Sequence, residues 1–181
     1  MINNPLSHGS VRVLIPEDSV SLKVQALAAA ISQDYDECAA LVMLGVMDGA
    51  LPFLADLLRL LSPQLQERTE FRLCRAASYN GMQRGALHTE KVPDLGGYDV
   101  LVVDDIIDTG HTLNDIVGQV EASSPRSVKT AVFLDKVSKR VVTGMKPDYV
   151  GYEIDDQFVI GYGMDYNDQF RALRYIGALP L

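Results

Sequence analysis

The chain has 181 residues, of which 48% are hydrophobic and 22% charged, a length and composition that fit one compact domain with its own core. Its 16 basic and 24 acidic side chains leave a formal net charge of −8, which repels polyphosphate backbones and argues against nucleic-acid binding. No apolar run reaches the ~18 residues of a membrane span, and two unpatterned cysteines without a signal peptide indicate a cytoplasmic protein.

The first third of the chain predicts two helices on either side of a buried strand. A short strand at 11–15 precedes a helix at 17–32, which opens with two acidic residues and has apolar residues at helical spacing. A buried strand at 39–44 then leads through a turn at 45–50 into an apolar helix at 51–61. Strand and helix periods therefore alternate from the start.

The rest of the chain continues this alternation. Strands are predicted at 70–79, 100–103, 128–134, 148–152, 158–162 and 174–177, with a helix at 113–121. The polar, glycine-bearing segment 80–97 lacks periodicity and is typical of a functional lid or a disordered excursion. We expect an α/β protein with a mostly parallel sheet flanked by helices, a single domain over residues 1–181, and a small cap formed by the chain ends.

Residues 99–112, Asp-Val-Leu-Val-Val-Asp-Asp-Ile-Ile-Asp-Thr-Gly-His-Thr, carry the strongest functional signal. The buried strand 100–103 places Asp104 and Asp105 at its C-terminal end, the edge at which open α/β sheets bind ligands. The next turn opens the helix at 113–121, whose first amides suit a phosphate dianion. The layout fits a ribose 5′-phosphate, with hydroxyls toward the acids and phosphate oxygens toward the amides.

Two other interpretations of this motif remain. An apolar strand that ends in two acids also occurs as the Walker B strand of nucleoside triphosphatases, but the chain contains no Gly-x-x-x-x-Gly-Lys-Ser/Thr motif. Asp-Thr-Gly could alternatively be a helix-capping turn with a solvated acid. The residues that follow along the chain favour the sugar-phosphate site.

A second group of polar and aromatic residues lies in the C-terminal part. Lys136 follows a predicted strand, and segment 156–171 contains an aromatic residue, an acid and an arginine in that order: Phe158, Asp165 and Arg171. Taken singly, each has an ordinary explanation as a core aromatic or a surface charge. Lys136, with basic residues at 139 and 140, could form a solvated basic patch.

In order and spacing, the acidic loop, the lysine and the aromatic-to-arginine segment resemble the hypoxanthine-guanine branch of the type I phosphoribosyltransferases, over residues 40–175 or so. The run Asp-Asp-Ile-Ile-Asp-Thr-Gly-His-Thr is the most specific part, and Asp108 is its discriminating position. The resemblance implies a type I phosphoribosyltransferase fold. It also implies an Mg²⁺-dependent purine salvage enzyme that transfers 5-phosphoribosyl from phosphoribosyl pyrophosphate to a 6-oxopurine, giving IMP or GMP and pyrophosphate.

The resemblance also implies roles at the purine. Asp108 is the expected general base or hydrogen-bonding anchor at purine N7. Lys136 is expected to donate to the 6-oxo group, an acceptor that adenine lacks. Phe158 is expected to stack on the base, and the backbone of Val159 to read its edge. Asp165 completes the purine-binding set and is expected to hold Mg²⁺.

The remaining implied roles concern the phosphoribosyl pyrophosphate. Asp104 and Asp105 are expected to hold the ribose hydroxyls, directly or around the metal ion, and Arg171 to bind pyrophosphate. The 5′-phosphate is assigned to Thr109, Gly110, His111, Thr112 and Leu113. The backbone of Gly49 is expected to bind pyrophosphate, although Asp48 before it is a carboxylate that cannot donate to that group. Ser78 and Tyr79 match the mobile lid of the family.

The sequence leaves several questions open. The choice among hypoxanthine, guanine and xanthine depends on groups that residue names do not locate, and the role of His111 is undecided. Relatives commonly form dimers or tetramers, so we expect a homodimer or homotetramer that acts on small molecules, without nucleic-acid or membrane partners. The competing class is a regulator that keeps the ribose-phosphate loop and binds RNA.

Overall fold

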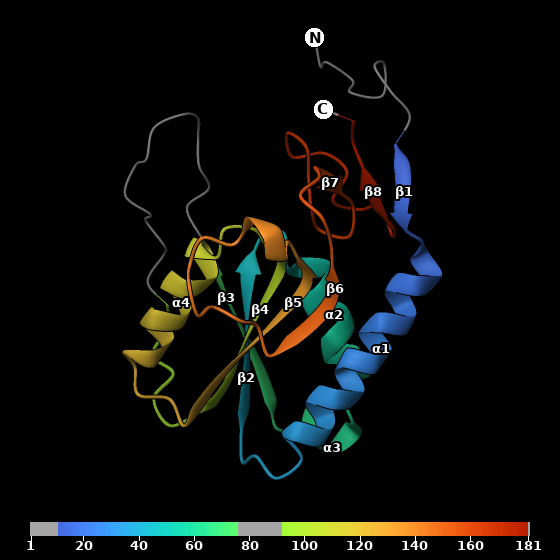
Figure 1. Ribbon diagram of the computed structural model, residues 1–181. Helices are drawn as coiled ribbons and strands as arrows, with labels where there is room; N and C mark the ends of the chain where they lie inside the picture. Colours follow the sequence, from blue (N-terminus) through green and yellow to red (C-terminus); the bar gives the residue numbers. More distant parts are fainter. Residues whose placement is uncertain (1–10, 76–91, 181) are drawn as a thin grey trace.

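The computed structural model describes residues 11–75 and 92–180, and its centre is a five-stranded parallel sheet (Figure 1). The strand order is β3-β2-β4-β5-β6, and each neighbouring pair is parallel. The strands are β2 (Leu41–Met47), β3 (Thr69–Arg75), β4 (Asp99–Ile107), β5 (Ser127–Asp135) and β6 (Tyr149–Glu153). This is the mostly parallel sheet that the alternating periods predict.

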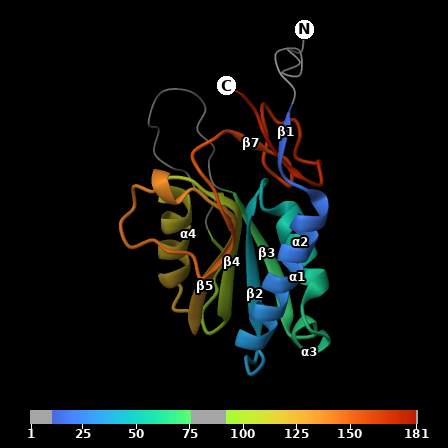
Figure 2. The same cartoon turned by 45° about the vertical axis from the view of Figure 1, so that its right-hand side comes forward.

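Helices cover both faces of this sheet, because the side chains of its central strands are apolar on both sides. Helices α1 (Glu17–Asp34), α2 (Leu51–Leu60) and α3 (Pro63–Gln66) lie on one side and α4 (His111–Glu121) on the other (Figure 2). Along β2, Leu41 and Met43 belong to the core under α1 and α2, whereas Val42 and Leu44 belong to the core under α4. This alternation follows from the two-residue period of a strand.

A second, three-stranded antiparallel sheet forms the predicted cap. It joins β1 (Arg12–Ile15) to β8 (Ile176–Ala178) and β8 to β7 (Val159–Ile160). Both ends of the described chain therefore meet in one small sheet, beside the carboxyl ends of the parallel strands (Figure 1). The cap places segment 158–171 over the edge of the main sheet that carries the acidic motif.

Several predicted boundaries were wrong. Strand β4 extends to Ile107, because it pairs with β5 as far as Asp135; Asp104 and Asp105 thus lie within the strand rather than after it. Helix α4 begins at His111, not at residue 113. Helix α2 ends at Leu60, close to the predicted end at residue 61. Ser62 then caps the short helix α3, which was not predicted, and its Oγ accepts a hydrogen bond from the Leu65 amide. Across residues 11–75 and 92–180, no helix is long and apolar enough to cross a membrane.

Candidate active site

The register of β4 and β5 brings the two most informative polar residues together. Ile107 pairs with Asp135, so Asp108 and Lys136 directly follow neighbouring strands. The Lys136 amide donates to the Ile107 carbonyl at 3.0 Å, which continues the ladder one step past the strand. The acid and the lysine are therefore adjacent at the carboxyl edge of the sheet, where ligands of such folds bind.

Asp104 and Asp105 form a poorly solvated acidic pair at the same edge. The Asp104 carboxylate accepts from the Asp105 amide, and the Asp105 carboxylate from the Ile106 amide, both at 2.9 Å. Burial raises the pKa of Asp104 well above its ordinary value, and the charge of Asp105 raises it further. Burial also raises the pKa of Asp105, although hydrogen bonds and the charge of Arg171 partly oppose this. Hydroxyl donors or a cation would stabilise the ionised form of these two carboxyls.

The loop between β2 and α2 lies against this pair through Gly49. A Cβ atom at Gly49 would stand 2.0 Å from Oδ2 of Asp105, so only glycine fits without a shift. The Met47–Asp48 peptide bond before it is cis. The Asp48 carboxylate pairs with Arg75 on β3 at 3.3 Å, which leaves backbone groups as the donors of this loop, as its sequence predicts.

The start of α4 has the form of an anion site. Gly110 caps the helix at φ +90°, where a side chain would be strained, and its carbonyl accepts from the Asn114 amide at 3.0 Å. The amides of His111, Thr112 and Leu113 head the helix and have no intrahelical acceptor. The Leu113 side chain is buried in the core and that of His111 is exposed. The carbonyl of Thr109 accepts from two amides of the next loop, which fixes the turn.

Four charged side chains alternate beside Asp108. Lys136 Nζ lies 3.8 Å from Asp108 and 3.3 Å from Asp156, and Lys139 Nζ lies 3.0 Å from Asp108 and 3.3 Å from Asp156. The side chain of Lys136 is 8% exposed. Within the described residues, Oδ1 of Asp108 is buried and has no hydrogen-bond partner. The cluster thus offers a buried ammonium donor next to a buried, unused carboxylate acceptor.

The predicted base-stacking residues lie on the cap. Phe158 is partly buried and meets Tyr166 edge to face, with ring centroids 5.7 Å apart. Val159 is buried in β7 and pairs with Ala178 of β8. The small sheet therefore fixes the backbone at Val159 while Phe158 keeps an exposed part.

Arg171 is held by its own segment. Its guanidinium donates to the Gly163 carbonyl at 2.7 Å and pairs with Asp165 at 2.8 Å. Gly163 has φ +102°, and a Cβ atom there would stand 1.9 Å from the Gly49 carbonyl oxygen. Two glycine backbones thus pack against each other, and this contact joins the cap to the β2–α2 loop near Asp105.

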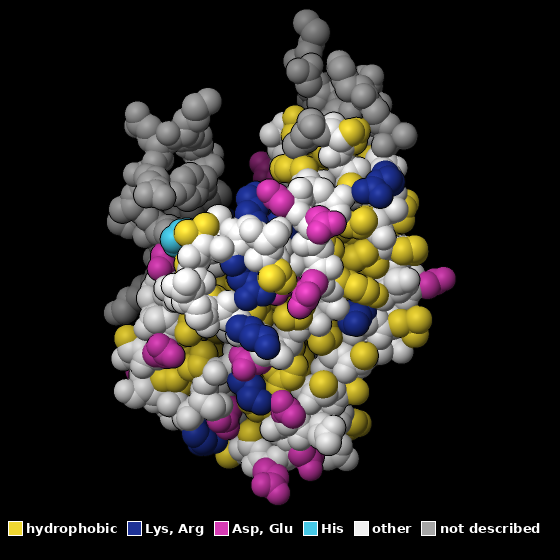
Figure 3. Space-filling view, in the orientation of Figure 1, with side chains coloured by type: hydrophobic (Ala, Val, Ile, Leu, Met, Phe, Trp, Pro, Cys, Tyr) yellow, Lys and Arg dark blue, Asp and Glu magenta, His cyan; other side chains and the backbone are white. Residues whose placement is uncertain are grey.

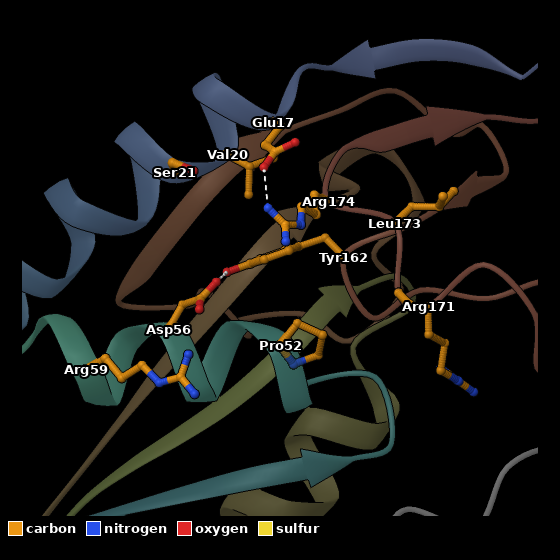
Figure 4. A pocket seen from close by; sticks show the side chains of 11 residues that line it. Glu17, Val20, Ser21, Pro52, Asp56, Arg59, Tyr162, Arg171, Leu173 and Arg174 are labelled. Atoms are coloured by element: carbon orange, nitrogen blue, oxygen red, sulfur yellow. Dashed lines mark hydrogen bonds and ion pairs between the residues drawn. The ribbon is translucent and has the colours of Figure 1, made fainter.

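A pocket of about 420 Å³ lies where this segment meets α1 and α2. Its polar groups bind one another: Tyr162 donates to Asp56 at 2.8 Å, and Arg174 pairs with Glu17 at 3.2 Å. Figure 4 shows the Arg171 side chain extending away from the Tyr162–Asp56 pair. These contacts hold the backbone of segment 162–174 against α1 and α2, and the Arg171 guanidinium extends to the opposite side of that segment.

Some predicted residues do not come together. Asp165 pairs with Arg171, and in the described part of the chain no three carboxylate, imidazole or thiol groups lie close enough to hold a metal ion. The described residues therefore do not bring Asp165 together with Asp104 and Asp105. Ser78 and Tyr79 lie outside the described residues. The sequence interpretation gave Lys139 no role at the site and named it only in the alternative of a solvated basic patch. Its spacing of three from Lys136 was the available signal.

Comparison with known proteins places these features in a family. A family model described as phosphoribosyl transferase domain matches residues 17–167. The hypoxanthine-guanine phosphoribosyltransferase of Bacillus subtilis is 36% identical over 178 residues, covering 96% of each chain. The hypoxanthine phosphoribosyltransferase of Escherichia coli K12 is 34% identical over 177 residues, covering 95% of this chain and 97% of the relative.

Solved structures agree with this assignment. A hypoxanthine-guanine phosphoribosyltransferase from Bacillus anthracis superposes with a TM-score of 0.84 at 30% identity, over 95% of this chain and all of the other. A hypoxanthine phosphoribosyltransferase from Staphylococcus aureus gives a TM-score of 0.85 at 29% identity, over 99% and 97% of the two chains. The chain therefore belongs to the phosphoribosyltransferase family and has its type I fold, as the acidic motif and the order of the later residues predict.

Proposed function

We propose that this phosphoribosyltransferase transfers the 5-phosphoribosyl group of phosphoribosyl pyrophosphate to N9 of hypoxanthine or guanine, forming IMP or GMP and pyrophosphate in purine salvage. The observation that carries this proposal is the pairing of Lys136 with the buried Oδ1 of Asp108, which has no hydrogen-bond partner among the described residues. A 6-oxopurine presents an acceptor at O6 next to a donor at N7–H. The two protein groups match that edge in order and in kind.

This edge distinguishes oxopurines from adenine. Lys136 is an obligate donor, and the exocyclic amine of adenine is also a donor, so adenine would leave the buried ammonium facing N–H groups. A site built around a hydrogen bond rejects ligands that cannot make it, because its buried polar group is left unpaired. Phe158 supports binding of either oxopurine, since stacking on an aromatic ring depends little on the substituent at C2.

The proposed transfer gives a role to Asp108, Arg171 and the loop at Gly49. As N9 forms its bond to C1′, the C1′–O bond to pyrophosphate breaks, its electron pair leaves with pyrophosphate, and the N7 proton passes to Asp108. Such a general base contributes about 10²–10⁴ in rate. Arg171 and the amides around Gly49 take up the charge of pyrophosphate. The predicted lid with Ser78 and Tyr79 is assigned the exclusion of water.

The acidic pair and α4 are assigned to the ribose 5-phosphate. Asp104 and Asp105 accept from the ribose hydroxyls, which relieves the poor solvation that raises their pKa values. The helix-heading amides of His111, Thr112 and Leu113, with the turn at Thr109 and Gly110, bind the 5′-phosphate. The side chain of Leu113 stays in the core, so its assigned part is its amide alone.

The residues present fit Mg²⁺ as a partner of the substrate. Mg²⁺ is commonly held by one or two carboxylates together with substrate phosphates and water. Buried Asp104 and half-buried Asp105 supply two carboxylates, and residues 11–75 and 92–180 place no third ligand beside them. When bound, the ion neutralises charge on the pyrophosphate. Asp165, which pairs with Arg171, then acts by orienting that guanidinium.

We also propose a cytoplasmic homodimer or homotetramer. Strand β3 is an edge strand of the sheet, and its Phe71 and Leu73 side chains are 56% and 46% exposed. Leu51 on α2 is 50% exposed as well. Large apolar side chains on an open sheet edge are typical of association surfaces. They support self-association through β3 and α2.

The alternative of an RNA-binding regulator has less support. On the face drawn in Figure 3, Lys and Arg side chains lie among Asp and Glu side chains rather than forming a continuous basic surface. With a formal net charge of −8, the chain lacks the basic balance that nucleic-acid binding favours.

The test is turnover by the purified protein with phosphoribosyl pyrophosphate, Mg²⁺ and hypoxanthine, guanine, xanthine or adenine in turn. We expect nucleotide and pyrophosphate in equal amounts from hypoxanthine or guanine and none from adenine. Rates on xanthine complete the substrate ranking. Nucleotide binding without turnover on any base, together with tight RNA binding, would overturn the proposal in favour of a regulator.

The role of Asp108 is tested by Asp108→Asn. We expect turnover to fall about 10²–10⁴-fold, with little change in affinity for phosphoribosyl pyrophosphate, because the side chain faces the base. Glu121→Gln, on the exposed last turn of α4, is the matched control and should leave both quantities unchanged. Equal losses of turnover and affinity in Asp108→Asn would contradict the assigned role.

A further inference from the structure

Lys139 reaches Asp108 because of the local backbone after β5. The 3₁₀ turn Val137–Lys139 follows Lys136 directly, and the Lys139 amide donates to the Lys136 carbonyl at 2.9 Å. In a 3₁₀ turn, side chains three residues apart eclipse one another. Both ammonium groups therefore project to the same side and meet the same two carboxylates, Asp108 and Asp156.

The two oxygens of Asp108 are in different surroundings. Oδ2 lies 3.0 Å from the Lys139 ammonium. Oδ1 is buried and lacks a hydrogen-bond partner in the described part of the chain, and its distance of 3.8 Å from Lys136 Nζ exceeds hydrogen-bonding range. Lys139 therefore occupies one oxygen, and the other remains available to a ligand.

We propose that Lys139 is a positioning residue for Asp108: it binds Oδ2 and thereby directs Oδ1 toward the N7 proton of the purine. The inference rests on the proposed function and deepens it. Lys136 cannot do the same work, since it stands too far from Asp108 and is assigned to O6. Lys136 thus acts on the base directly, at O6, and Lys139 acts on it through the carboxylate of Asp108.

Asp156 sets the position of both lysines. It lies 3.3 Å from each ammonium, and these contacts lower the pKa of its carboxyl. The contact with Asp108 is the main cause that raises the pKa of Lys139, so the ammonium form that binds Oδ2 is favoured. The Lys139 side chain is 39% exposed, which allows it to follow the carboxylate as the base enters.

The neighbouring arginine cannot replace Lys139. Arg140 points to the other side of the turn, where its guanidinium binds the Asp135 carboxylate and the Met145 carbonyl. These contacts fix the turn itself. In contrast, Lys146 lies in the same β5–β6 connection, is exposed, and forms no ion pair with any described residue. Lys146→Met is therefore a matched control for loss of one lysine charge in this loop.

The test compares Lys139→Met, Lys139→Arg, Lys146→Met and Asp108→Asn in steady-state kinetics. For Lys139→Met we expect kcat to fall about 10–100-fold, the scale of a misplaced catalytic group, with the KM for phosphoribosyl pyrophosphate nearly unchanged. Lys139→Arg should restore most of the rate, and Lys146→Met should match the unchanged protein.

The outcomes separate this inference from the proposed function. If Asp108→Asn loses turnover while Lys139→Met keeps its kcat, Lys139 is an ordinary surface cation and only this inference fails. If Asp108→Asn itself turns over normally, the assignment of Asp108 as base fails first. Equal thermal unfolding midpoints for Lys139→Met and Lys146→Met are expected, and they would show that a rate loss does not come from unfolding.

Discussion

Gly49 provides the most direct test of how the site is assembled, through the substitution Gly49→Ala. The added Cβ would stand 2.0 Å from Asp105 Oδ2, whereas ordinary van der Waals contact begins at 3.4 Å. The difference of about 1.4 Å (3.4 − 2.0) must be absorbed by the loop or the carboxylate. Oδ2 belongs to a half-buried side chain whose carboxylate accepts a hydrogen bond from the Ile106 amide, so the shift cannot occur freely.

Two costs follow from this displacement. Overpacking of a fitted contact costs about 1–3 kcal/mol of stability. A displacement of ~1 Å in a reactive site costs about 10²-fold in rate, so we expect kcat/KM for phosphoribosyl pyrophosphate to fall about 100-fold or more. The KM for the purine should change little, because Lys136 and Asp108 lie on other loops.

The assay is steady-state kinetics with each substrate varied in turn, alongside urea unfolding. Gly118→Ala is the matched control: Gly118 lies in α4, and a Cβ there meets nothing within 4 Å. That substitution should stabilise the protein by about 0.5–1 kcal/mol and leave the kinetics unchanged. A Gly49→Ala protein with kcat/KM within about twofold of the original would refute the close packing of Gly49 on Asp105, since a 1 Å shift should cost far more.

Three further substitutions test charge and association. Because the pKa of Asp104 is raised in the folded state, its contribution to stability is fully present below the unfolded-state pKa and is lost as pH rises through the folded-state value. Asp104→Asn should therefore be more stable than the original protein at neutral pH, and the difference should shrink toward pH 4. Urea unfolding at both pH values measures this difference. An equal difference at the two pH values would contradict the assigned burial cost. Asp48→Lys should lower the inhibition constant of pyrophosphate, because it leaves a lysine and the released Arg75 beside that loop; an unchanged constant would place the side chain away from pyrophosphate. Phe71→Lys, which puts a charge on the exposed edge strand, should shift sedimentation-velocity profiles toward monomer, and a control at exposed Glu121 should not; an unchanged profile would exclude β3 from the interface.

The order of elements and the main candidate residues could be predicted because they depend on local pattern. The apolar run at 100–103 is long enough to be a buried strand, and the helical spacing after it predicts a helix there, although α4 begins at His111, two residues before the predicted start. Asp104 and Lys136 each come after a predicted strand, and the roles expected of Asp108 and Lys136 followed from the family resemblance; the register of β4 and β5 then showed that these two residues are adjacent. The cap also followed from the short strands at the two ends of the chain.

Other features depended on contacts that the pattern does not contain. The length of β4 is decided by its pairing with β5. The sequence analysis therefore placed Asp104 and Asp105 after the strand, whereas both lie within it. The exposure of Phe71 follows from the position of β3 at the sheet edge, whereas its alternating pattern is equally compatible with an inner strand. Strand order is a property of the whole fold.

By itself, the sequence determined the α/β class, the acidic motif and the order of motifs that resembles the phosphoribosyltransferase family, since these are encoded by residue type and spacing. Only the tertiary structure decided that Gly49 lies on Asp105, that Gly163 lies on Gly49, and that Lys139 holds one oxygen of Asp108. Each of these contacts joins segments whose separation is set by strand register and loop path. Packing at that scale depends on distances of an ångström, which a linear pattern of polar and apolar residues does not specify.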